Sequence, residues 1–272
     1  LARLLMSSAP SYVLVDDFNH DGRLDVALTA HGGNHSRFFL QLKSRQWQAG
    51  PEIPEVGMHP GELMSLEGED GQRTILLFAE GDNKLRVMSP TPYGGMKVDA
   101  EIDAIFPRAG TQFHWPGWDL GLAFAPFTQA MIVLVEGFEP DKATARAAHF
   151  LRYKPAFAKT QQVAAADLEG DGIDEILFMN PPKGQILMIR YPCGEANPAI
   201  EELWTFPEMG PARFVIPADI DQDGDLDILV PGETGQASGA VTALNLLIKD
   251  DGGGWRQTAI TLPAMTKEDG GI

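Results

Sequence analysis

The chain has 272 residues, with 21 Lys and Arg against 38 Asp and Glu, and therefore a formal net charge of −17 at neutral pH. This acidity argues against a nucleic-acid binder, which needs a basic surface to displace phosphate counterions, and against docking on anionic lipid. With 44% hydrophobic residues the chain can still bury a core, so it is not an acidic disordered tail. The 29 Gly and 20 Pro predict many tight turns.

The ends and the cysteine content give further expectations. No apolar run reaches the roughly 18 residues of a membrane span, so no membrane insertion is expected. Residues 1–6 are too short for a signal-peptide core and no initiator Met is present, which favours a mature form or a slice of a longer chain. The single cysteine, Cys193, cannot form an internal disulfide.

An acidic motif of nine residues occurs three times, at 17–25, 167–175 and 219–227. Each copy has Asp, Asn or Glu at positions 1, 3, 5 and 9 and Gly at position 6. Because the copies start about 150 and about 50 residues apart, the spacing predicts a repeat of about 50 residues. Five units then cover the chain, at roughly 11–57, 58–110, 111–160, 161–211 and 212–265.

The expected strands follow in chain order. Unit one has apolar runs at 12–15, 26–28 and 38–42 and a polar, alternating segment near Trp47. Unit two retains a degenerate loop at 66–74, followed by runs at 75–78 and 85–88. Unit three has runs at 122–124 and 131–135, taken as its first two strands around a loop at 125–130 without acids. The best helical candidate, at 142–151, is expected as an insertion between the second and third strands, with a strand as the alternative. Units four and five have runs at 163–166, 176–179, 186–191, 214–218, 228–230 and 241–248, with polar segments near Trp204 and Trp255.

Four short strands per unit, separated by Gly and Pro turns, are typical of a propeller blade. The sequence therefore predicts an all-β protein, a β-propeller of four-stranded blades, with residues 1–272 forming one propeller or part of one.

The acidic motif predicts a metal site, because hard oxygen donors at this density suit Ca²⁺ and the Gly supplies the sharp bend. Without metal, three or four carboxylates in one turn repel each other. An EF-hand is excluded because position 12 is Leu28, Phe178 or Val230 rather than Glu. An acidic turn without metal remains the alternative. By position, the expected ligands are Asp17, Asn19, Asp21, the Arg23 carbonyl and Asp25 in the first loop; Asp167, Glu169, Asp171, the Ile173 carbonyl and Glu175 in the second; and Asp219, Asp221, Asp223, the Asp225 carbonyl and Asp227 in the third.

These loops, with strands on both sides and a period near 50, resemble the FG-GAP/VCBS repeats of integrin-α-type β-propellers. The resemblance implies that each Ca²⁺ loop joins the first two strands of a blade and stiffens it, and that units two and three bind no Ca²⁺. The longer Glu169 and Glu175 are expected to weaken or reshape the second site. Relatives of this kind form rings of about seven blades, so the chain is expected to be a fragment of a larger ring; a closed ring of five, with residues 1–5 as a swapped strand, is the alternative.

Five aromatic residues in loops are candidates for a ligand mouth. Loops after second strands and loops between blades gather on one face of a propeller, so these residues are expected to meet around a sugar or a metal: His31, His59, His114, Trp115 and Trp118. The alternative is that they pack loops against each other. Asp119 and His114 are also weighed as acid and base of a lyase.

The leading functional hypothesis is a Ca²⁺-stabilised, extracellular or periplasmic propeller that serves as a binding or scaffold module in a larger protein or complex, with a protein or glycan partner. No phosphate-binding loop and no Gly-x-Ser-x-Gly elbow occur. The competing hypothesis is a carbohydrate-active enzyme, a lyase or hydrolase, or a lectin that uses the His/Trp mouth.

Overall fold

The computed structural model describes residues 4, 6–53, 56–67, 73–91, 95–127, 130–142, 144–153, 162–181, 184–192, 197–206, 214–232, 243–250 and 252–261. Residues 1–3 and 5 of the segment weighed as a swapped strand lie outside the described residues, as do residues 68–72 of the degenerate loop and Cys193. Among these residues, the structure has no helix of the length and apolarity needed to cross a membrane.

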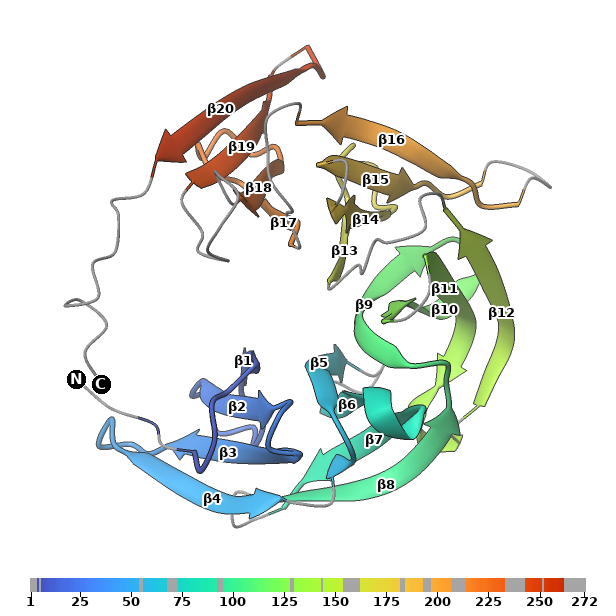
Figure 1. The fold of residues 1–272 in the computed structure, drawn as a ribbon. Coiled ribbons are helices and arrows are strands. Elements are labelled where there is room, and N and C mark those ends of the chain that lie inside the picture. The colour runs from blue at the N-terminus through green and yellow to red at the C-terminus, as the bar shows by residue number, and fades with distance from the viewer. Residues whose placement is uncertain are drawn as a thin grey trace. The chain divides into compact units, whose positions relative to one another are not determined.

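The chain forms five four-stranded sheets, each with its strands in chain order (Figure 1). The predicted fold class, an all-β propeller built of four-stranded blades, is confirmed. The strands are β1 (Tyr12–Asp16), β2 (Asp25–Ala30), β3 (His35–Gln41) and β4 (Trp47–Ile53); β5 (Pro60–Glu67), β6 (Arg73–Ala79), β7 (Lys84–Pro90) and β8 (Met96–Asp103); β9 (Pro107–Trp115), β10 (Trp118–Pro126), β11 (Met131–Glu139) and β12 (Thr144–Arg152); β13 (Val163–Ala166), β14 (Glu175–Asn180), β15 (Gln185–Ile189) and β16 (Ile200–Thr205); and β17 (Ile216–Ala218), β18 (Asp227–Gly232), β19 (Ala243–Lys249) and β20 (Trp255–Thr261). Two single-turn 3-10 helices, η2 (Glu80–Asp82) and η3 (Pro140–Lys142), follow β6 and β11.

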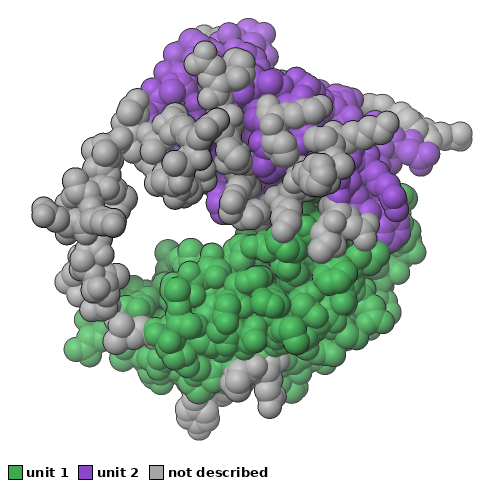
Figure 2. Space-filling model, viewed as in Figure 1, with its two compact units in different colours: residues 1–112, 119–128, 132–149 green, residues 113–118, 129–131, 150–272 purple. Residues whose placement is uncertain are grey.

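The chain divides into two compact units (Figure 2). Unit 1 comprises residues 1–112, 119–128 and 132–149, and unit 2 comprises residues 113–118, 129–131 and 150–272. The two units are described separately below.

The sequence misplaced the strands of the third blade. The predicted first and second strands, 122–124 and 131–135, lie in its second and third strands, and β9 occupies the first position, beginning before the expected start of the blade at 111. A tight turn at Pro116 and Gly117, where Gly117 has a φ of 80°, joins β9 to β10. Because no acidic loop marks this junction, nothing in the sequence distinguished the first strand. The helical candidate at 142–151 is instead strand β12, whose burial alternates as expected for a strand with one solvated face.

The buried positions follow from the strand pattern. Each second strand contains a short apolar run, and all six residues of β14 are buried. In contrast, β8 alternates between half-buried and exposed residues along its length. In unit 1 the core includes Phe18, Phe38 and Leu77, with the rings of Phe18 and Phe38 packed edge to face at 5.5 Å. A second core in unit 2 includes Leu168 and Ile228. Phe18 and Leu168 occupy position 2 of their acidic loops, so each loop is anchored in a core by an apolar side chain.

Candidate functional site

The three acidic loops each connect the first and second strands of a blade and share one backbone conformation. Position 6 is a Gly with positive φ in every copy, 81° at Gly22, 84° at Gly172 and 100° at Gly224. Position 4 is also left-handed, with φ of 56° at His20 and 65° at Gln222. Glycine adopts this conformation without the steric cost of a Cβ, which explains the residue at position 6.

The acid at position 1 folds each turn by accepting backbone N–H groups. Asp17 accepts from Gly22 at 2.7 Å, Asp167 accepts from Gly172 at 2.7 Å, and Asp219 accepts from Gly224 at 3.3 Å. The same carboxylate is therefore a structural acceptor as well as an expected metal ligand.

The acid at position 9 is buried at the start of the second strand. Asp25 and Asp227 are fully buried, and each accepts one N–H from position 2 of its own loop and one from the end of the third strand. Glu175 accepts the N–H of Leu168 at 3.0 Å. Burial raises the pKa of Asp25 and of Glu175, while these hydrogen bonds lower it. Position 9 therefore ties the loop to the blade whether or not a metal is bound.

The third loop fits a hard cation best. Carboxylate oxygens of Asp219, Asp221 and Asp227 lie within 4.8 Å of one another, and no other group of this kind occurs in the described part of the chain. Lys and Arg side chains compete in the other two loops. Arg23 forms an ion pair with Asp21 in the first, and Arg190 and Lys249 lie 3.4 Å and 3.9 Å from Glu169 in the second. No described Lys or Arg pairs with an acid of the third loop.

Two of the expected mouth residues meet in unit 1. The rings of His31 and His59 lie 4.7 Å apart between centroids, and His31 Nε2 lies 3.6 Å from a carboxylate oxygen of Glu80. Glu80 pairs with Arg108 at 3.0 Å, and Arg108 Nε donates to the Tyr12 hydroxyl, also at 3.0 Å. We call these five residues the polar cluster.

Protonation within the polar cluster is shifted by burial. Burial and the nearby Arg108 cation lower the pKa of His31, against the opposing effect of Glu80. Burial also raises the pKa of Tyr12, and Arg108 opposes this shift. The Nε2 atom of His31 is buried and accepts or donates no hydrogen bond among the described residues. A neutral imidazole with an unpaired buried nitrogen is suited to contact a bound molecule or a water.

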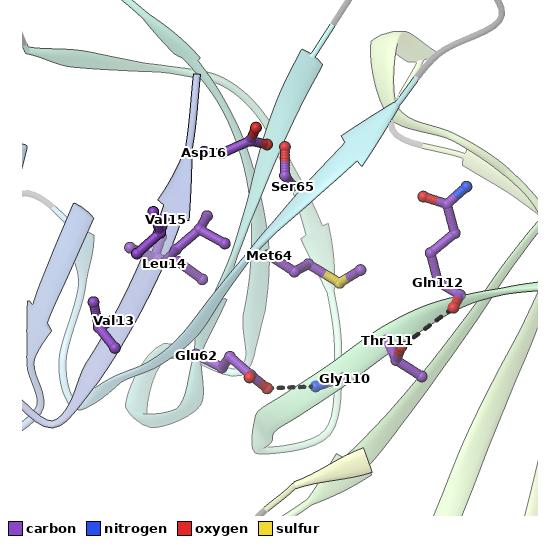
Figure 3. A pocket seen from close by; sticks show the side chains of 11 residues that line it. Val13, Leu14, Val15, Asp16, Glu62, Met64, Ser65, Gly110, Thr111 and Gln112 are labelled. Carbon is purple, nitrogen blue, oxygen red and sulfur yellow. Dashed lines mark hydrogen bonds between the residues drawn. The ribbon is translucent and has the colours of Figure 1, made fainter. Parts of the chain in front are cut away.

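A pocket of about 430 Å³ adjoins the polar cluster within unit 1 (Figure 3). Its walls are residues 13–16 of β1, 62–65 of β5 and 110–112 of β9. Glu62 accepts the Gly110 N–H at 3.2 Å, the bond drawn in Figure 3. The pocket and the polar cluster share two strands, since Tyr12 precedes Val13 on β1 and Arg108 precedes Gly110 on β9. The charge of Glu62 also raises the pKa of Tyr12, so the acid of the pocket and the polar cluster interact electrostatically.

Glu62 is the most perturbed acid of this pocket. The residue is half-buried, and desolvation of its carboxyl group raises the pKa from the ordinary 4.5 to about 8, although the Gly110 N–H opposes the shift. A carboxylic acid that keeps its proton near neutral pH can donate it to a leaving group.

The other expected mouth residues lie in unit 2 and have packing roles there. His114 contacts a carboxylate oxygen of Asp174 at 3.0 Å, and Trp115 Nε1 donates to the Asp174 carbonyl at 2.7 Å. Trp115 is 4% exposed and packs edge to face against Trp118 at 5.1 Å and against Tyr191 at 5.6 Å. Trp115 is thus a core residue rather than a stacking platform. Asp119, weighed as partner of His114, belongs to unit 1 and lies 3.5 Å from Arg146.

The sequence did not single out Tyr12, Glu62, Glu80 or Arg108. One signal was present: Ala79-Glu80 ends the second strand of blade two as Ala30-His31 ends that of blade one, and both alanines are fully buried. Aligning the two repeats would have shown that His31 and Glu80 occupy equivalent positions in adjacent units of the sequence. Glu62 carried no comparable signal, because its perturbation arises from burial.

No protein-family model and no curated protein sequence matches the chain. Solved structures do match. A periplasmic gluconolactonase from Pseudomonas aeruginosa is 14% identical, with a TM-score of 0.64 over 93% of this chain and 70% of that one. A 6-phosphogluconolactonase from Bacteroides fragilis, described as putative, is 13% identical, with a TM-score of 0.61 over 94% and 71%. A protein from Lactobacillus plantarum is 12% identical, with a TM-score of 0.63 over 93% and 72%.

These similarities are of fold. They correct the resemblance drawn from the sequence: the solved structures similar to this chain are lactonase-like propellers and not FG-GAP/VCBS repeat proteins. The nine-residue loop is a short local motif, and it proved a poor guide to the relatives of the whole fold.

Proposed function

We propose that this chain is a carbohydrate-active hydrolase that opens a sugar lactone or a similar cyclic ester in the unit 1 pocket. The observation that carries the proposal is Glu62, an acid at the pocket wall whose pKa is raised to about 8. Glu62 acts electrostatically on Tyr12 of the polar cluster, which also holds His31 and its unpaired Nε2. The structural similarity to gluconolactonase-type propellers supports the choice of substrate class.

The reaction needs a base and an acid. His31 would take a proton from a water molecule as the water oxygen bonds to the lactone carbonyl carbon. Glu62 would give its proton to the ring oxygen as the ring C–O bond breaks, which leaves a hydroxy acid. Positioned general acids and bases contribute about 10² to 10⁴ in rate, so each group is worth testing by substitution.

The test is hydrolysis of δ-gluconolactone, followed by acid release with spontaneous opening subtracted. We expect turnover by the wild-type chain and a loss of about 100-fold or more in Glu62→Gln. Glu201→Gln, at a residue whose side chain is 57% exposed on β16, is the matched control and is expected to keep full activity. Binding without turnover would favour a lectin-like role instead.

The third acidic loop favours a second function, Ca²⁺ binding, because three of its carboxylates converge without a competing cation. In this proposal Ca²⁺ stiffens an extracytoplasmic propeller, which serves as a binding or scaffold module for a protein or glycan in a larger chain or complex. Open sites of this kind need the millimolar Ca²⁺ found outside the cytosol, and the P. aeruginosa neighbour is a periplasmic protein. Metal analysis after dialysis against Ca²⁺ tests it, and a chain without bound Ca²⁺ would contradict it.

A further inference from the structure

The charges around the unit 1 pocket constrain what it can bind. Its walls contain two acids, Asp16 and Glu62, and no Lys, Arg or His. Asp16 is buried, and one of its carboxylate oxygens accepts the Asp17 N–H at 2.8 Å. The walls therefore offer no cation to an anionic ligand.

The charge of Arg108, the cation of the polar cluster, is already compensated. Its Nη1 pairs with Glu80 at 3.0 Å, its Nε donates to Tyr12, and its guanidinium lies 4.2 Å from the centroid of the Phe127 ring. The side chain is 13% exposed. A phosphate would have to displace Glu80 or bring further negative charge beside it, at a cost in either case.

The pocket walls do offer neutral hydrogen-bonding groups. Ser65, Thr111 and Gln112 all line it, as Figure 3 shows. The Ser65 hydroxyl is buried and has no hydrogen-bond partner among the described residues. A buried hydroxyl without a partner is expected to be satisfied by a water or a ligand hydroxyl.

We propose that the pocket selects a neutral, hydroxyl-rich ring and discriminates against its phosphorylated counterpart. This specificity rests on the proposed function, because it concerns the same pocket, but it is a statement about binding. In this proposal Ser65 contacts the ligand. Glu80 neutralises the charge of Arg108 by pairing with it, so that Arg108 does not bind an anionic ligand.

The experiment is isothermal titration calorimetry of the full chain with 1,5-anhydroglucitol and with its 6-phosphate, two non-hydrolysable rings that differ only in the phosphate. We expect the neutral ring to bind at least 10-fold more tightly. Ser65→Ala is expected to weaken binding of the neutral ring several-fold. Glu80→Gln is expected to improve binding of the 6-phosphate and so to reduce the difference in affinity between the two rings. Thr91→Ala, outside the pocket walls, serves as a folding and binding control.

The outcomes separate the two proposals. Equal or tighter binding of the phosphate, or no binding of either ring, would overturn the inferred specificity. Preferential binding of the neutral ring together with no hydrolysis of δ-gluconolactone would support the specificity and overturn the hydrolase. Hydrolysis of δ-gluconolactone together with tighter binding of the 6-phosphate would support the hydrolase and overturn the specificity. Since Ser65→Ala removes only a hydroxyl, it keeps the test informative even if Glu80→Gln fails to fold.

Discussion

At the scale of single residues, the environment of Glu62 decides its chemistry more than its identity does. Glu52, for example, accepts hydrogen bonds from Ser7, and these bonds lower the pKa of Glu52. In the pocket, desolvation outweighs one N–H bond, so the pKa rises instead. The sequence shows both as Glu, and only the packing of β5 against β9 distinguishes them.

The raised pKa of Glu62 also predicts how stability depends on pH. The folded state holds this proton up to about pH 8, whereas the unfolded chain releases it near 4.5, so the folded state binds more protons between these values. The free energy of unfolding therefore falls as pH rises through this window, by up to about 1.4 kcal/mol per pH unit from this residue. Urea unfolding at pH 5, 6.5 and 8 measures it. In Glu62→Gln the free energy of unfolding is expected to fall less steeply with pH than in Glu201→Gln. An equal slope in the two variants would refute the raised pKa of Glu62.

Gly61 is a second residue whose role depends on packing. A Cβ there would press against the carbonyl oxygen of Arg108 and lie 2.9 Å from that of Phe78, so β5 and β9 approach too closely for a side chain. Gly61→Ala is expected to destabilise the chain by about 2 kcal/mol, measured by urea unfolding. Gly32→Ala is the control, since a Cβ there meets nothing within 4 Å. Equal stability of the two variants would mean that β5 and β9 are not so closely packed.

At the scale of elements, the acidic loops made some strands predictable and left others obscure. In blades one, four and five the loop marks the junction of the first two strands, and the sequence placed those strands correctly. Blade three has no such marker, so the sequence analysis missed β9. The runs in β10 and β11 were therefore assigned to the first and second strands instead of the second and third. The polar cluster shows the same limit, because Tyr12 and Arg108 lie on different blades and their hydrogen bond joins residues 96 positions apart in sequence.

The acid at position 9 should stabilise its blade independently of metal. Asp25 accepts backbone N–H groups from Phe18 and Gln41, and both donors would lose this acceptor in Asp25→Ala. We expect a loss of about 2–3 kcal/mol in unfolding free energy, with or without EDTA. Asp103→Ala, at a side chain 91% exposed, is the control. A loss seen only when Ca²⁺ is present would make Asp25 a metal ligand rather than a structural acceptor.

At the scale of the whole molecule, the fold class was predictable from the repeat, whereas the relatives and the site were not. The period of about 50 residues and the count of strands per unit report the blade directly. The acids of the three loops contribute part of the net charge of −17. These acids are not only potential metal ligands, because those at positions 1 and 9 already accept backbone N–H groups. Among the described residues, only the third loop brings three carboxylates together.

Calcium should raise the stability of the whole chain if the third loop binds it. With Ca²⁺ at about 100 times its dissociation constant, one site adds about 2.7 kcal/mol. A rise in melting temperature of about 5–10 °C is therefore expected between EDTA and excess Ca²⁺. Asp223→Ala should reduce this rise. Because Asp223 also accepts the Asp225 N–H at 2.9 Å, the quantity to compare with the wild type is the difference in melting temperature between EDTA and Ca²⁺. Identical melting curves in EDTA and Ca²⁺ would contradict the metal site.

The most direct test of the proposed enzyme is the pH profile of δ-gluconolactone hydrolysis by the wild-type chain and Glu62→Gln. If Glu62 is the proton donor, kcat/KM of the wild type falls as pH rises through about 8, where that carboxyl group loses its proton. Glu62→Gln should then be at least about 100-fold slower and lack this limb. A variant with wild-type rates and the same profile, or a wild-type chain without turnover, would contradict the proposal.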